Sequence, residues 1–238
     1  MGKNSGRRRK ALVRSRSRVA FFRTRVTAPM PVSEPHVLAA FDAPFTARYG
    51  VVVGVDEAGR GCLAGPVVAA AVVLPAGAAL PGVDDSKKLS AARREEAFAR
   101  ITAAALAIGV GACSPDEVDR LNVLHAAMEA MRRAVAALAH PVTGAALVPN
   151  LLLIDGNRAF PEPPCLAITV VGGDARSLSI AAASIVAKVT RDRLMRALAD
   201  DFPAYGWAQN AGYPTAAHYA ALAAHGPTAH HRRTFRLG

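Results

Sequence analysis

The hydrophobic pattern of the chain becomes regular only after about residue 45. Four prolines interrupt the first 45 residues, and no helical or strand periodicity is sustained there. Val51–Val55 is an apolar, β-branched run that predicts a buried strand, and Pro66–Leu74 predicts a second one. We therefore expect a disordered N-terminal arm over residues 1–45 and one folded domain over residues 46–238.

Helical and strand patterns alternate in the rest of the chain. Ser90 is a suitable N-cap for a helix over Ala91–Leu106. Ser114 and Pro115, with an acid three residues after the serine, predict another helix that continues to about Leu138. The remaining apolar stretches predict strands at Ile108–Cys113, Asn150–Ile154 and Leu166–Val171, and helices at Ser177–Ala199 and Pro214–Ala224.

This order of elements predicts an α/β domain in which helices cover both faces of a mixed sheet. Ligand sites in open α/β sheets form beyond the carboxyl ends of the strands. Two apolar runs end there in a carboxylate, at Asp56 and at Asp155. If their strands are parallel neighbours, these two carboxylates lie side by side. Glu57 follows directly, and Asp174 comes after the fifth strand and two glycines.

These four acids form a set without a nearby histidine or cysteine. Hard oxygen ligands of this kind suit Mg²⁺ or Mn²⁺, and two such ions can assist the cleavage of a phosphodiester. Any one of the acids could instead cap a helix or lie in a solvated loop. That alternative is much weaker for four acids that each follow a strand, so we expect Asp56, Glu57, Asp155 and Asp174 to bind metal.

A glycine turn, Gly59-Arg60-Gly61, follows the first two acids. It loosely imitates a dinucleotide-binding turn, but that motif requires a following helix, whereas a strand is predicted from Pro66. We therefore expect the glycines to allow close approach of a ligand. Arg60 could contact phosphate or pair with an acid. Tyr213, in a later loop, could stack on a sugar or base or belong to the core.

The charge distribution separates the arm from the body. Of 29 Lys and Arg residues, ten lie in residues 1–25, which contain no acid, so 19 basic and 18 acidic residues remain in residues 26–238. The arm could bind nucleic acid, serve as a targeting segment or be a solvated extension. The three cysteines are isolated in sequence, which favours a reducing cytoplasm, and no apolar run is long enough to span a membrane.

At the level of motifs, the chain from about residue 48 resembles ribonuclease HII. The matching segments are Gly54–Gly61, Asp85–Ser90, Ile154–Asn157, Gly173-Asp174, Ser179–Val189 with Arg191-Asp192, and Gly212–Thr215 with His218.

The resemblance implies a ribonuclease H-like fold with a five-stranded mixed sheet and a C-terminal helical segment. It implies cleavage of RNA in RNA–DNA hybrids and at ribonucleotides embedded in duplex DNA, leaving a 3′-hydroxyl and a 5′-phosphate. We also expect the protein to be a monomer. The substrate contacts that it implies are Gly59, Arg60 and Gly61 on the ribose 2′-hydroxyl, Tyr213 on the sugar, and Ser86, Lys88 and Ser177 near phosphate.

Three positions depart from the family pattern. Cys62 replaces a common proline, and Gly173 and Ala211 replace common lysines. The lost lysines would weaken contacts with a polyanion, and the basic arm could compensate. A non-catalytic nucleic-acid-binding protein is the alternative from another class, but it would have no reason to collect carboxylates where phosphate must bind. Ribonuclease HIII is a third alternative, although it carries a larger N-terminal domain.

Overall fold

The computed structural model describes residues 35–238 except 84, 85 and 88. Its five strands are β1 (Val52–Ala58), β2 (Val67–Val73), β3 (Ala107–Cys113), β4 (Leu151–Asp155) and β5 (Leu166–Val170). They form one sheet in the order β3-β2-β1-β4-β5. The pairs β1–β2 and β2–β3 are antiparallel, and β1–β4 and β4–β5 are parallel. The five-stranded mixed sheet is therefore confirmed.

The described residues form seven α-helices and two short 3₁₀ helices. These are α1 (Pro35–Tyr49), α2 (Ala91–Ala104), α3 (Pro115–Leu121), α4 (Val123–Ala136), η1 (Gly173–Ala175), α5 (Leu178–Asp201), η2 (Pro203–Tyr205), α6 (Trp207–Asn210) and α7 (Ala216–His225).

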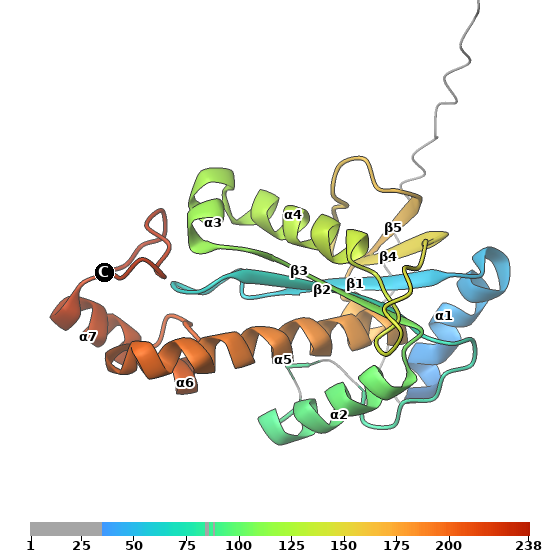
Figure 1. Cartoon of the computed structure of the whole chain (residues 1–238), viewed down its shortest axis with the longest axis horizontal. Helices are drawn as coiled ribbons and strands as arrows, with labels where there is room; N and C mark the ends of the chain where they lie inside the picture. The colour runs from blue at the N-terminus through green and yellow to red at the C-terminus, as the bar shows by residue number, and fades with distance from the viewer. Residues whose placement is uncertain (1–34, 84–85, 88) are drawn as a thin grey trace, which may run out of the picture.

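The sheet lies between two helical layers (Figure 1). Helix α4 covers one face, where Val53, Val55 and Ile154 pack with its alanines. Helix α5 covers the other face, where Ala70 and Val72 pack against it. A side chain at Gly54 would collide with the main chain of Ser179, so β1 and the start of α5 lie very close together. The end of β1 and the N-terminal region of α5 are thus rigidly placed with respect to each other.

The predicted helix from Pro115 to Leu138 is interrupted in the structure. Asn122 has a positive φ of 61°, which ends α3, and its side chain accepts hydrogen bonds from the N–H groups of Leu124 and His125. At φ 61° and ψ 161° this backbone conformation is strained for a residue other than glycine, and the two capping hydrogen bonds offset part of that cost. One predicted helix therefore becomes two, and α4 packs flat on the sheet.

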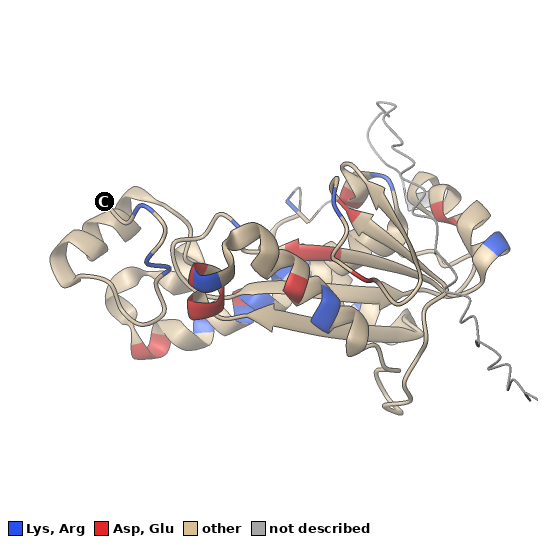
Figure 2. Ribbon diagram, turned by 90° about the horizontal axis from the view of Figure 1, so that it is seen from above, with Lys and Arg blue, Asp and Glu red and all other residues tan. Residues whose placement is uncertain are grey.

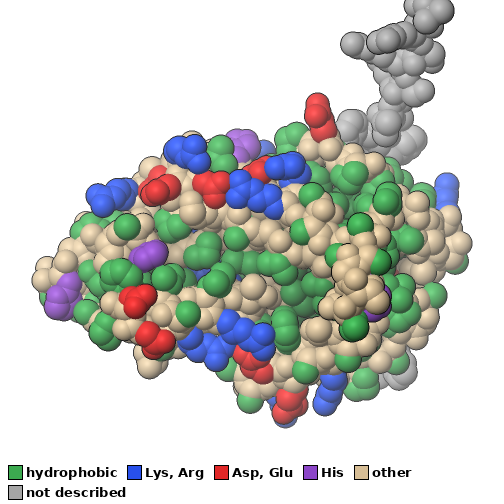
Figure 3. Space-filling model, in the orientation of Figure 1, with side chains coloured by type: hydrophobic (Ala, Val, Ile, Leu, Met, Phe, Trp, Pro, Cys, Tyr) green, Lys and Arg blue, Asp and Glu red, His purple; other side chains and the backbone are tan. Residues whose placement is uncertain are grey.

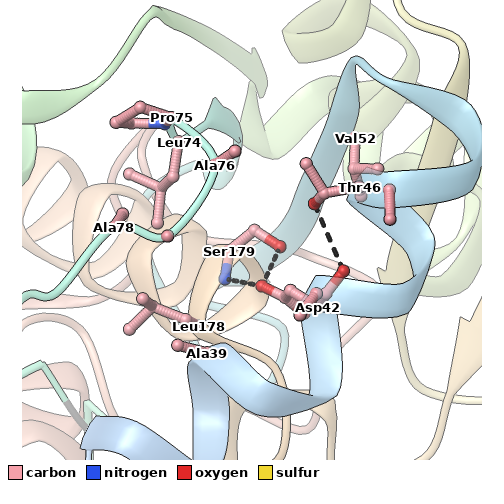
Figure 4. Close-up of a pocket in the computed structure, with 13 residues that line it drawn as sticks. Ala39, Asp42, Thr46, Val52, Leu74, Pro75, Ala76, Ala78, Leu178 and Ser179 are labelled. Carbon is pink, nitrogen blue, oxygen red and sulfur yellow. Dashed lines mark hydrogen bonds between the residues drawn. The ribbon is translucent and has the colours of Figure 1, made fainter.

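The boundary placed at residue 45 cuts through α1, so the folded body extends back at least to Pro35. Leu38 of this helix is fully buried. Asp42 accepts two hydrogen bonds of 2.8 Å from Ser179, one from its N–H and one from its hydroxyl (Figure 4). Burial raises the pKa of Asp42. Two of the four prolines that suggested an irregular arm, Pro35 and Pro44, lie at the start of α1 and inside it; residues 1–34 of the arm lie outside the described residues.

The surface of the body has mixed charge, as its near-neutral composition predicts. On the face seen in Figure 3, charged side chains lie along the two long borders, and hydrophobic side chains lie between them. That face carries no single large basic patch. Among the described residues, no helix is both long enough and apolar enough to cross a membrane.

Candidate active site

Asp56 and Asp155 lie next to each other at the carboxyl ends of two parallel strands. In the β1–β4 ladder Val55 pairs with Ile154, so the following residues are the two aspartates. Both line one cavity of about 300 Å³, together with Glu57. Figure 2 shows acidic residues in red on the central strands of the molecule. The juxtaposition that was expected for parallel neighbouring strands is therefore present.

Glu57 reaches the same cavity although β1 does not end at Asp56. The strand continues to Ala58, and neighbouring side chains on a strand point to opposite faces. Glu57 nevertheless lines the cavity of Asp56 and also a smaller one on the side of α4. The acid pair thus spans the end of the sheet from one face to the other.

Burial and neighbouring acids raise the pKa values of the Asp56 and Asp155 carboxyl groups. Burial, followed by repulsion from Glu57 and Asp155, raises the pKa of Asp56 well above its usual value. Burial, followed by repulsion from Asp174, raises the pKa of Asp155 to about 6. Main-chain N–H groups oppose these shifts: Gly173 donates to Asp155 at 2.6 Å and Glu57 donates to Asp56 at 2.7 Å. These hydrogen bonds do not outweigh burial and repulsion, so the pKa values of both aspartates stay raised.

The other two acids each pair with a basic side chain. Arg60 contacts Glu57 at 3.0 Å, and Lys87 contacts Asp174 at 3.0 Å. Asp174 lies on η1 and is outside the lining of the main cavity, but its charge acts on Asp155. Arg60 therefore pairs with an acid in this conformation, which is one of its two sequence-based interpretations.

These four carboxylates suit hard divalent cations chemically. Their oxygens are the ligands that Mg²⁺ and Mn²⁺ prefer, and a cation would relieve the repulsion that raises the pKa values of Asp56 and Asp155. As the side chains stand, no three Asp, Glu, His or Cys groups within the described ranges are already arranged to hold an ion. Metal binding by all four acids would therefore require Glu57 to release Arg60 and Asp174 to release Lys87.

The glycine turn forms another wall of the same cavity. Gly59, Arg60 and Gly61 line it beside the acids, and Tyr213 faces them from the loop before α7. The side chain of Tyr213 is 37% exposed. Lys188 Nζ lies 5.4 Å from the centre of its ring. The structure thus brings the turn and the tyrosine to the edge of the acid cluster.

The three predicted phosphate contacts, Ser86, Ser177 and Lys88, do not share one location. Ser86 lines the cavity, and its hydroxyl lies 2.9 Å from that of Ser184. Ser177 is fully buried, and its hydroxyl caps α5 by accepting from the N–H of Ile180. Ser177 is outside the lining of the cavity, and its capping role accounts for its burial. Lys88 lies outside the described residues.

Sequence reasoning missed two residues of the cavity. Lys188 forms an ion pair of 2.6 Å with Asp192 and also lines the cavity. Ser184 was not singled out; its hydroxyl forms a hydrogen bond that lowers the pKa of Asp56. Both lie on α5 one turn apart, and their position over the end of β1 was the missing information.

Comparison with known proteins agrees with this geometry. The family model described as "Ribonuclease HII" matches residues 53–237. A ribonuclease HII of Granulibacter bethesdensis is 60% identical over 193 residues, which cover 79% of this chain and 84% of that protein. A ribonuclease HII of Geobacter sulfurreducens is 54% identical over 188 residues, covering 79% and 83%.

Solved structures show the same fold. The structure described as a PCNA:RNase HII complex from Archaeoglobus fulgidus matches with a TM-score of 0.65 and 27% identity, over 78% of this chain and 95% of that one. The ribonuclease H2 of Pyrococcus horikoshii OT3 matches with a TM-score of 0.61 and 25% identity, over 79% and 94%. A Bst-RNase HIII in complex with Mn²⁺ shares the fold at a TM-score of 0.60 and 20% identity, over 86% and 71%.

Proposed function

Because this chain belongs to the ribonuclease HII family, and is thereby a metal-dependent endoribonuclease acting on RNA–DNA hybrids, we propose that it also cuts duplex DNA at single embedded ribonucleotides. The products are a 3′-hydroxyl and a 5′-phosphate. The observation that supports this most strongly is one cavity with acids on one side and the Gly59–Gly61 turn with Tyr213 on the other.

The acids are proposed to hold Mg²⁺ or Mn²⁺. Asp56 and Asp155 would anchor the ions, and Glu57 and Asp174 would complete the ligand set. Two ions bound there would supply activation of the attacking water and stabilisation of the leaving oxygen of the phosphodiester. The Mn²⁺ complex among the structural neighbours belongs to a ribonuclease HIII; the choice of ion here rests on the all-carboxylate donor set.

The remaining side chains of the cavity are proposed to bind and orient the substrate. The Gly59–Gly61 turn contacts the ribose 2′-hydroxyl, and Tyr213 packs on the sugar beside it. Ser86 and Lys188 face the same cavity, where a hydroxyl and a cation suit phosphate oxygens. Arg60 and Lys87 neutralise Glu57 and Asp174 in the conformation described here. These two basic groups become available for phosphate when the acids take a metal.

A protein that only binds nucleic acid remains the alternative from another class. Burial of Asp56 and Asp155 beside each other argues against it, because each buried carboxylate near a phosphate path repels the ligand and costs stability. We further propose that the enzyme works as a monomer in the cytoplasm. The three cysteines, none of which forms a disulfide, are consistent with a reducing compartment.

The metal-binding role is tested by Asp56→Asn. This change keeps the size of the side chain and removes its charge, so we expect cleavage of an RNA–DNA hybrid to fall by about a thousandfold or more in Mg²⁺ and in Mn²⁺. Binding of the hybrid should be largely retained. Asp200→Asn, at an exposed position of α5, is the matched control. Full activity of Asp56→Asn would defeat the assignment.

A further inference from the structure

Two fully buried arginines lie behind the Gly59–Gly61 turn. Arg191 belongs to α5, and Arg232 belongs to the segment that follows α7. Within the described part of the chain, both guanidinium groups donate hydrogen bonds only to main-chain carbonyl oxygens. Burying a cation without a carboxylate partner is costly. The main-chain segments that the two guanidinium groups hold together therefore account for the burial of these arginines.

Arg232 joins the Gly59–Gly61 turn to Gly65, four residues after it. Its guanidinium group donates to the carbonyls of Gly59 at 2.7 Å and Arg60 at 2.9 Å. It also donates twice to the carbonyl of Gly65, at 2.9 and 3.1 Å. The planar, five-donor fork of arginine can satisfy these acceptors together, whereas the single ammonium group of a lysine cannot.

Arg191 connects the turn to the loop that carries Tyr213. It donates to the carbonyls of Pro66 at 2.9 Å and Ala64 at 3.0 Å, on the far side of the turn. A third hydrogen bond of 2.8 Å goes to the carbonyl of Ala211, two residues before Tyr213. The same guanidinium carbon lies 5.8 Å from the centre of the Tyr213 ring. Arg191 thus sets the distance between the two proposed substrate contacts.

The two glycines of the turn face opposite environments. Gly59 has a φ of 92°, and an added Cβ would lie 2.0 Å from Nε of Arg191. An added Cβ at Gly61 would meet no atom within 4 Å among the described residues. The inner side of the turn is therefore shaped by Arg191, and the outer side is open toward a ligand.

We propose that Arg191 and Arg232 are positioning residues that fix the main chain of the Gly59–Gly61 turn relative to Tyr213, and so determine selectivity for a ribose embedded in DNA. This inference rests on the proposed function. A continuous hybrid offers a ribose at every step of one strand, so it tolerates a displaced turn. A single embedded ribonucleotide offers one register only, and its cleavage depends on exact placement.

The segment that carries Arg232 has an anchor far from the cavity. Asp119 on α3 accepts hydrogen bonds from the N–H groups of Arg233 at 2.8 Å and Thr234 at 3.0 Å. Main-chain hydrogen bonds join the same segment to the residues just after the turn, from Gly65 N–H to the carbonyl of His230 and from Arg232 N–H to the carbonyl of Leu63. Asp119→Ala therefore loosens the position of Arg232 without touching a proposed substrate contact.

The test compares two substrates. We would measure kcat/KM for a DNA duplex with one ribonucleotide and for a continuous hybrid, in wild type, Arg232→Lys and Arg191→Lys. The ratio of the two values should fall by about tenfold or more in both variants. Arg196→Lys, at an exposed position that pairs with Glu95, should leave the ratio unchanged. Hydrogen exchange of peptides spanning residues 59–65 should become faster in Arg232→Lys but not in Arg196→Lys.

Each outcome decides the question. A folded Arg232→Lys variant with an unchanged ratio of kcat/KM values and unchanged hydrogen exchange overturns the proposal. An equal loss of kcat/KM on both substrates also overturns it, because the arginine then has only a general structural role. If Arg232→Lys does not fold, Asp119→Ala decides by the same two measurements. If wild type fails to cut the embedded ribonucleotide, the proposed function has failed, and the exchange data alone decide whether the arginines position the turn.

Discussion

At the residue scale, the site is organised by the electrostatic cost of placing Asp56 beside Asp155. The unfolded chain ionises both carboxyl groups freely, whereas the folded protein resists doing so. The proposed mechanism uses the ionised forms at neutral pH, so in it the metal-free enzyme carries an electrostatic cost that a bound cation would relieve. Removing one charge should therefore abolish function and stabilise the protein.

Asp155→Asn tests this relation through pH. The pKa of Asp155 is about 6 in the folded protein, above its value of 3.8 in the unfolded reference. The folded state thus holds more protons between these values, and stability falls as pH rises through that window. At pH 7.5, without metal, we expect Asp155→Asn to melt a few degrees higher than wild type (roughly 2–4 °C per kcal/mol).

The same comparison at pH 4 should show little difference between the two proteins, because Asp155 is then largely protonated. Added Mg²⁺ should raise the melting temperature of wild type more than that of Asp155→Asn. A variant that is less stable than wild type at both pH values would contradict the electrostatic interpretation.

The two glycines of the turn give a matched pair of substitutions. Gly61→Ala should change stability by no more than about 0.5 kcal/mol, because the added methyl group enters open space. Its kcat/KM should fall, because the methyl group occupies the approach path of the substrate. Gly59→Ala should cost about 1 kcal/mol or more, because of its positive φ and its contact with Arg191. Thermal unfolding measures the effect on stability, and steady-state kinetics measures the effect on kcat/KM. Equal stability losses in the two variants would contradict the assignment of Gly59 to the inner side of the turn and of Gly61 to the open side.

The sequence identified the acids more readily than the residues that support them. Asp56 and Asp155 could be found because each follows an apolar run, and adjacent parallel strands place such residues together. Arg232 lies more than 160 residues after the turn that it holds. No local pattern records a contact between main-chain carbonyls and a distant side chain.

At the element scale, the predictions failed where a helix end depended on one side chain. The break between α3 and α4 is set by the conformation and capping of Asn122, inside a stretch whose apolar pattern is otherwise continuous. Helix α1 was missed because Pro44 lies inside it and the hydrophobic pattern of the segment is weak. Its stability comes from tertiary contacts with α5, which the sequence alone does not reveal.

The docking of α1 can be tested at Asp42. Asp42→Ala removes the acceptor of both Ser179 hydrogen bonds and leaves two buried donors without it. We expect a loss of about 1–3 kcal/mol in the free energy of unfolding. Asp42→Asn retains an acceptor oxygen and should lose less. Denaturant unfolding measures both variants, and wild-type stability of Asp42→Ala would show that this contact does not hold the helix.

At the scale of the whole molecule, the near-neutral body leaves the first 34 residues as the main excess of positive charge. Deleting residues 1–34 retains α1 and removes ten basic residues. In an Asp56→Asn background, which prevents cleavage, we expect hybrid affinity to fall and its dependence on salt to become shallower. Each lost phosphate contact lowers the slope of log K against log salt by about 0.7–0.9.

A full-length variant with the same ten residues changed to glutamine controls for the loss of chain length. It should behave like the deletion if charge is responsible. An unchanged salt slope in both would mean that the arm does not compensate for Gly173 and Ala211.

The most direct measurement incubates the wild-type protein with a DNA duplex carrying one ribonucleotide and with a continuous RNA–DNA hybrid, in Mg²⁺ and in Mn²⁺. The proposed site predicts cleavage of both substrates, with a 3′-hydroxyl and a 5′-phosphate at the cut, and no cleavage by Asp56→Asn. Cleavage of the hybrid alone would contradict the role of the Gly59–Gly61 turn and Tyr213, and cleavage of neither would contradict the metal site itself.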